Sequence, residues 1–291
     1  MSNWPATTVR ALLLTVTLLP GVAHADARAQ GEALLRAGKF EEAAEQLERA
    51  IAQSPKDAKA HNLLAQAYGA EASAGGMITK MRLAGKVRDH FERAVALAPD
   101  EIEYREALLE FYAQAPSAMG GGLDKAQAEA AQIAKRDRVR GLLATGRIAQ
   151  LEGNAELALS KYRQAATEQP GYARTVLRLV VYLQELKRWA EAFQRLDALV
   201  ARDATAGAAW YQLGRTAVLS NSRHADGENA LKRFLSMPRG ENSPPLEAAH
   251  WRLGMLYELM GRKADAKKQY LAAQQVNPGH KESKAALKKL G

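Results

Sequence analysis

The chain has 291 residues, of which 41 are Lys or Arg and 32 are Asp or Glu, so its formal net charge is +9. It contains no cysteine, which excludes disulfides, cysteine-ligated zinc, iron–sulfur clusters and thiol catalysis. Its apolar content of 47% is carried mostly by Ala and Leu, and the abundant Glu, Gln, Lys and Arg favour a mainly helical protein.

The first 25 residues have the pattern of a secretory signal peptide. Arg10 is the only charged residue among them, an apolar run covers 11–19, and Ala23-His24-Ala25 gives the small-x-small motif of a cleavage site. We expect cleavage between Ala25 and Asp26 and a mature protein in the periplasm. An uncleaved anchor is the alternative, although the apolar run is shorter than the about 20 residues of a spanning helix. No later segment resembles a membrane span.

Beyond this segment, one arrangement of residues returns along the chain. It begins with Gly31, Gly38, Ala43, Leu47, Ala50 and Pro55, returns with Gly146, Gly153, Ala158, Tyr162, Ala165 and Pro170, and is clearest in Leu253, Gly254, Tyr257, Gly261, Ala266, Tyr270, Ala273 and Pro278. The pattern resembles the tetratricopeptide repeat (TPR), a 34-residue helix–turn–helix unit. Its small residues let the second helix approach the first, and its large ones fill the space between successive pairs.

The spacing of prolines supports the same period. Pro55, Pro99, Pro170 and Pro278 are separated by 44, 71 and 108 residues, which are one, two and three periods with short insertions. The resemblance, to exported bacterial members of the family, therefore implies an all-α fold. We expect a right-handed superhelical solenoid of about seven TPR helix–turn–helix repeats over residues 26–280. The charged segment 281–291 is predicted to be a C-terminal capping helix.

Two insertions interrupt the period, near 69–80 and near 115–124. Loops longer than a repeat demands often carry function, and a similar pair occurs in exported bacterial repeat proteins of unassigned role. The glycines at 120–122 precede Lys125, but a phosphate-binding loop requires Gly-Lys followed by Ser or Thr, and here Ala126 follows. We expect a flexible connector in which Asp124 caps the next helix.

The sequence contains no legible catalytic or metal-binding pattern. Beyond residue 25 no two histidines have i, i+4 spacing, so no zinc motif is present, and no cofactor is implied. His224 lies near Ser220 and Asp226 in a connector that lacks a nucleophile elbow. Glu103, Glu106 and Glu110 share one helix face, which is typical of a solvated stripe. We therefore expect a protein that is not an enzyme.

The family resemblance implies that the first helix of each repeat lines a concave groove that binds a peptide or a partner helix. The groove residues predicted from helix position are Arg140, Arg147, Arg174, Arg178, Gln184, Tyr211, Arg215 and Trp251. Guanidinium groups bind carboxylates, and Tyr and Trp provide rigid contact area, so an acidic peptide is a suitable partner. The carboxylate clamp of chaperone-binding relatives is incomplete, because Ala144 stands where an Asn is expected.

Three functions compete on this basis. The first is a scaffold or adaptor of the bacterial cell envelope that binds another protein or an extended, acidic peptide. The alternative is a binder of anionic envelope polymers or lipid head groups, suggested by the positive charge; export argues against nucleic acid. The third, an enzyme, has only the two insertions in its favour and would require them to enclose a polar pocket.

Overall fold

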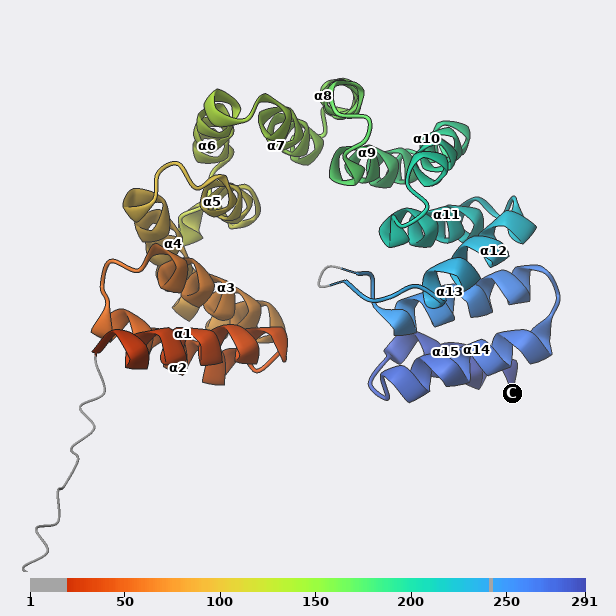
Figure 1. Ribbon diagram of the computed structural model, residues 1–291, viewed down its shortest axis with the longest axis horizontal. Helices are drawn as coiled ribbons and strands as arrows, with labels where there is room; N and C mark the ends of the chain where they lie inside the picture. The colour runs from red at the N-terminus through yellow and green to blue at the C-terminus, as the bar shows by residue number, and fades with distance from the viewer. Residues whose placement is uncertain (1–19, 241–242) are drawn as a thin grey trace, which may run out of the picture. The chain divides into compact units, whose positions relative to one another are not determined.

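The computed structural model describes residues 20–240 and 243–291, and every regular element within them is a helix (Figure 1). Most of the predicted signal peptide lies outside the described residues, and Pro20 begins the first helix. Proline suits this position because a first helical residue needs no amide donor. Export and cleavage remain predictions.

The chain divides into two compact units, Met1–Glu129 and Ala130–Gly291. The helices of the first unit are α1 (Pro20–Arg36), α2 (Phe40–Gln53), α3 (Ala58–Ala74), α4 (Met77–Leu97) and α5 (Ile102–Gln114), with a 3-10 turn η1 (Ser117–Met119). Helix α6 (Leu123–Arg136) continues across the division.

The second unit continues with nine helices. They are α7 (Arg138–Leu151), α8 (Ala155–Glu168), α9 (Ala173–Glu185), α10 (Trp189–Arg202), α11 (Gly207–Ser220), α12 (His224–Leu235), α13 (Leu246–Leu259), α14 (Lys263–Val276) and α15 (Lys281–Leu290). In the described part of the chain, six pairs of consecutive helices pack together, from α1–α2 to α13–α14, and α15 follows them. Helices α5 and α6 are joined by the ion pair between Arg105 and Glu129. The all-helical repeat architecture expected from the sequence is confirmed.

Close approach within a pair depends on glycine in the first helix. A Cβ added at Gly254 would lie 2.4 Å from the ring of Tyr270, and one at Gly146 would lie 2.7 Å from the ring of Tyr162. Both tyrosines are fully buried, and the ring of Tyr162 also meets that of Tyr182 in the next pair, with centroids 5.3 Å apart. The small and large residues of the repeat therefore act together to set how closely its helices pack.

The first insertion is helical rather than a loop, which corrects the expectation from sequence. Helix α3 runs on to Ala74, and only Gly75 and Gly76 separate it from α4. The Ala-rich stretch 70–74 consists of strong helix formers, so the added residues lengthen the helices. In the second insertion η1 interrupts the connector, and Asp124 is the second residue of α6 instead of its cap, where its charge still favours the helix N-terminus.

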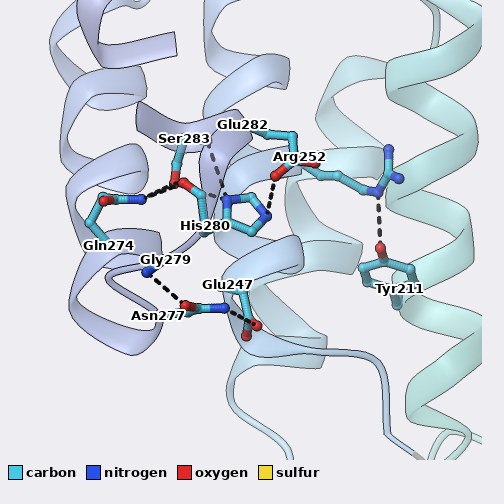
Figure 2. A network of polar contacts seen from close by, with 9 residues as sticks. All are labelled: Tyr211, Glu247, Arg252, Gln274, Asn277, Gly279, His280, Glu282 and Ser283. Carbon is cyan, nitrogen blue, oxygen red and sulfur yellow. Dashed lines mark hydrogen bonds and ion pairs between the residues drawn. The ribbon is translucent and has the colours of Figure 1, made fainter. Parts of the chain in front are cut away.

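At the C-terminal end, α15 packs on α14 (Figure 1). His280 caps α15 by accepting a hydrogen bond from the backbone N–H of Ser283 (Figure 2). Gln274 of α14 donates to the side-chain hydroxyl of the same serine. Leu287 and Leu290 are partly buried against the last core cluster. The lysines of α15 stay exposed, as a helix that ends a repeat array requires.

Candidate functional site

The first helices of the second unit are joined by hydrogen bonds between side chains. We name as the first-helix strip the residues that make these bonds: Gln150, Gln184, Glu185, Tyr211, Gln212, Arg215, Thr216 and Arg252. They come from α7, α9, α11 and α13, so one row of polar groups runs through four successive repeats. The regular repeat produces this row because it places the same helix face at every step.

Gln184 is a buried member of the strip, with 4% of its surface exposed, and Thr216 beside it is fully buried. Its amide nitrogen donates to the Thr216 hydroxyl at 2.8 Å and to the Gln212 side chain at 3.2 Å. Its carbonyl oxygen accepts a hydrogen bond from Arg215. Because a buried amide is stable only when hydrogen-bonded, this cluster fixes α9 against α11.

Tyr211 and Arg252 join α11 to α13. The Arg252 Nε–H donates to the Tyr211 hydroxyl at 3.0 Å (Figure 2), and the guanidinium lies 5.1 Å from the Trp251 ring centroid. The Trp251 ring in turn meets the His280 ring edge-on, with centroids 5.9 Å apart. Aromatic rings thus hold the Arg252 side chain in place.

Two guanidinium groups of the strip repel one another. Burial lowers the pKa of Arg215, and the charge of Arg252 lowers it further. The group stays charged, since arginine is not deprotonated in proteins. Within the described part of the second unit, neither arginine forms an ion pair. An anion placed between them would relieve the repulsion.

Arg147 of α7 and Arg178 of α9 lie near the same tyrosine. Burial raises the pKa of Tyr162 to about 12, while the charges of Arg178 and Arg147 act in the opposite direction. Arg178 is exposed and Arg147 is half-buried.

The remaining predicted groove residues lie nearer the helix N-termini. Arg140 is in the first turn of α7, where its backbone N–H donates to the capping Asp137 at 2.9 Å. Arg174 is exposed in the first turn of α9, and Trp251 is half-buried in α13. The structure therefore brings Gln184, Tyr211 and Arg215 into the strip and places the others along its helices.

Sequence reasoning missed several strip residues, and Arg252 is the most important of them. A signal was present, because Gln150 and Gln184 are separated by one repeat period of 34 residues. Polar residues that recur at the repeat period occupy equivalent positions, so their recurrence identifies a shared face. Arg252 has no equivalent of this kind and becomes evident only from its hydrogen bond to Tyr211.

The two insertions meet in the first unit at an open groove of about 590 Å³. It lies along the C-terminal part of α3, along α4 and α5, and against the segment before η1. Its walls are mainly apolar, and it is not the enclosed polar pocket that an enzyme would require. The amine of Lys125, once considered for phosphate, donates to the Gly120 carbonyl at 3.1 Å.

Other ligand types find little support among the described residues. No group of three or more His, Asp or Glu side chains in this part of the chain is placed to hold a metal ion. His224, the first residue of α12, hydrogen-bonds to the exposed Asn221 at 2.9 Å. Across residues 20–240 and 243–291, no helix has the length and hydrophobicity needed to cross a membrane.

Comparison with known families gives two matches. Residues 31–70 match the family described as TPR repeat, and residues 248–280 match the family described as Tetratricopeptide repeat. The first segment covers the end of α1, all of α2 and most of α3, and the second covers most of α13 and all of α14. No curated protein matches the chain.

Solved structures share the fold. A tetratricopeptide repeat protein from Parabacteroides merdae is 13% identical, with 93% of this chain and 99% of that chain covered and a TM-score of 0.54. The human IFIT1 dimer with PPP-AAAA is 17% identical, with coverage of 94% and 63% and a TM-score of 0.59. The APC/C hetero-tetramer Cut9-Hcn1 is 14% identical, with coverage of 89% and 48% and a TM-score of 0.53. At these identities the likeness concerns the fold alone.

Proposed function

Because the chain is a tetratricopeptide-repeat protein, we propose that it is a non-enzymatic scaffold that binds another protein along the first-helix strip. Arrays of this kind present extended surfaces to their partners, and each repeat adds one step of that surface. The bound segment is an extended peptide that crosses α7, α9, α11 and α13.

The observation that carries the proposal is the pair Arg215 and Arg252. Both are cationic and repel each other, and neither forms an ion pair in the described residues of the second unit, although the charge of Glu185 acts on Arg215 in the opposite direction. Arg178 adds a third exposed guanidinium from α9 that forms no ion pair there. Guanidinium groups form strong two-pronged hydrogen bonds with carboxylates, so the favoured partner is acidic.

The same proposal includes the location of the protein. Residues 1–25 carry the features of an exported leader, and the absence of cysteine suits an oxidising compartment because folding depends on packing alone. The scaffold would then act in the bacterial cell envelope. Fractionation of cells followed by N-terminal sequencing tests this part, and a mature protein that begins at Asp26 in the periplasmic fraction is the expected result.

The binding part is tested by cross-linking in envelope extract and identification of partners by mass spectrometry. The double variant Arg178→Glu and Arg252→Glu is compared with Arg202→Glu and Arg233→Glu, which changes the net charge equally at exposed positions on second helices. We expect at least a tenfold loss of the specific partner with the first variant and little change with the second.

Two results contradict this proposal. Equal recovery of every partner by wild type and both variants removes the strip from binding. Equal loss with both double variants, together with salt-sensitive binding to phosphatidylglycerol vesicles, favours the alternative of a protein that binds anionic polymers or lipid head groups through its overall charge.

A further inference from the structure

The open groove of the first unit is a second surface with no assigned role. It exists because both insertions contribute to it: α3 and α4 extend past the length of a regular repeat, and the segment that ends at Met119 closes one end. The described helices of the second unit show no such extension. Helices α7, α8, α13 and α14, for example, have 14 residues each. We call this surface the insertion groove.

Small and large side chains both line the insertion groove, and its buried lining residues are Ala84, Val87 and Phe91 of α4. Gly69 of α3 also lines the groove. No atom outside the local backbone lies within 4 Å of a Cβ built at Gly69, so there is free space above this position. This space admits bulky side chains of another element.

The rim of the groove is apolar, flexible and exposed. Met77, which lines the groove, is 65% exposed, and its neighbours Ile78 and Met81 are 84% and 65% exposed. Large apolar side chains gathered at one exposed place mark interaction surfaces. Methionine side chains adapt to different partners because they are unbranched and polarizable.

The charge of the rim indicates what kind of partner fits. Two charged side chains line the groove: Glu110, which accepts a hydrogen bond from Gln114, and Lys80, which forms no ion pair within residues 20–129. The neighbouring Arg82 is bound to Glu71 at 2.7 Å. An acidic side chain on a partner would meet an uncompensated ammonium group. A second copy of this chain would bring its own basic α4 end against Lys80, so self-association is disfavoured.

We propose that the insertion groove binds an amphipathic helix of another protein, with aliphatic side chains between α4 and α5 and an acidic residue at Lys80. The lining residues on α4 recur at helical spacing, and a groove between helices accepts side chains of a partner helix at i, i+3, i+4 and i+7. This site is separate from the first-helix strip, and neither depends on the other.

The probe is a fluorescein-labelled eighteen-residue peptide with Leu at i, i+3, i+4 and i+7 and with Glu and Ala elsewhere; fluorescence anisotropy with the full chain measures its binding. We expect saturable binding that weakens at least tenfold with the double variant Met77→Asp and Met81→Asp, and about fivefold with Lys80→Glu. All three side chains are exposed, so their replacement leaves the fold intact. The same peptide with Lys in place of Glu is expected to bind more weakly than the Glu peptide.

Leu271→Asp and Lys263→Glu are the matched controls, since these side chains are exposed on α14 of the second unit. Failure of wild type to bind the Glu peptide overturns the proposal, as does equal weakening by the controls. It is also overturned if the Met77→Asp and Met81→Asp variant leaves peptide binding unchanged but abolishes sedimentation with phosphatidylglycerol vesicles. The proposal is likewise overturned if wild type does not bind the peptide but forms a dimer in analytical ultracentrifugation, and the Met77→Asp and Met81→Asp variant does not form this dimer.

Discussion

The pairs α3–α4 and α13–α14 are built from the same repeat but use it differently. Helices α13 and α14 have 14 residues each, and Gly254 lets the buried ring of Tyr270 fill the space between them. Helices α3 and α4 have 17 and 21 residues, and their added turns carry the exposed side chains of Met77, Ile78 and Met81. Both pairs are well formed and both expose large apolar side chains, among them Leu271 of α14, but the exposure is greater on the added turns of α4.

This difference shows two ways in which a repeat array acquires a binding surface. In the second unit, the first-helix strip arises from a face that every repeat presents. In the first unit, the insertion groove arises where helices exceed the length of their neighbours, so that among residues 20–129 the apolar side chains of the added turns stay exposed. The first surface is polar and the second is apolar, as their origins require.

The largest expected effect compares the stability contributed by a buried ion pair of the first unit with that contributed by an exposed ion pair of the second. The side chain of Arg105 in α5 is 9% exposed and binds Glu129 of α6 at 2.7 Å, whereas Arg138 of α7 binds Glu168 of α8 with its side chain 72% exposed. We expect Glu129→Ala to lower the free energy of unfolding by about 3–5 kcal/mol, because a buried guanidinium loses its partner. Glu168→Ala should cost less than about 1 kcal/mol.

Urea denaturation followed by circular dichroism measures both variants, and hydrogen exchange locates the loss within the chain. Similar small effects for Glu129→Ala and Glu168→Ala would mean that the first unit does not depend on its buried ion pair. In that case the two units would not differ in the stability that these ion pairs contribute, and helix length would remain the difference between them.

The next effect compares a filled and an open position for glycine. A Cβ at Gly254 meets the Tyr270 ring, which cannot move freely because its hydroxyl is bound to Glu258. We expect Gly254→Ala to destabilise by about 1–3 kcal/mol through overpacking. Gly85 in α4 has no atom within 4 Å of an added Cβ, so Gly85→Ala should stabilise by up to about 1 kcal/mol through helix propensity.

Thermal unfolding by circular dichroism distinguishes the two substitutions by the sign of the change in Tm. A fall in Tm for Gly85→Ala would show that α4 is covered by a neighbour in solution. The comparison between the covered and the extended pair would then fail at this position.

The helix pairs could be predicted from sequence because their determinants are local. Gly146 and Tyr162 lie 16 residues apart, and the same relation links Gly254 to Tyr270. Each relation lies within one helical hairpin, so it does not depend on contacts with other repeats. The prediction of a loop at the first insertion is wrong because a departure from the repeat period does not by itself end a helix, and the alanines at 70–74 favour helix.

The candidate sites were less predictable, because they depend on contacts between repeats. Helix position identified Gln184 and Arg215 as members of one face, but not the burial of Gln184 or its hydrogen bond to Arg215. These follow from the rotation of α9 relative to α11, which sequence periodicity does not specify. The insertion groove depends on residues from three helices and a connector, and no local pattern links them.

The smallest expected effect concerns a histidine pair found in the extended repeat. Nε2 of His61 lies 3.2 Å from the Pro55 carbonyl, which only accepts, so this nitrogen carries the hydrogen. Nδ1 of neutral His61 is then an acceptor, and His90 Nδ1 donates to it at 2.9 Å. Burial lowers the pKa of His90, and the charge of His61 lowers it further. Asp89 and Glu48 raise it to a smaller extent, and Lys86 lowers it.

Stability should therefore fall as the pH drops below about 6.5, the pKa of an unfolded histidine. Between that value and the lower pKa of folded His90, this histidine binds a proton in the unfolded chain but not in the native protein. Acidification therefore favours unfolding. We expect Tm to decline from pH 7 to pH 5 in wild type and to decline less in His90→Gln. His250→Gln is the control in α13, where the side chain bonds Gln269 of α14 at 2.8 Å. Equal slopes for wild type and His90→Gln would show that the pair does not resist protonation, and the extended repeat would then differ from the regular one only in its uncovered turns.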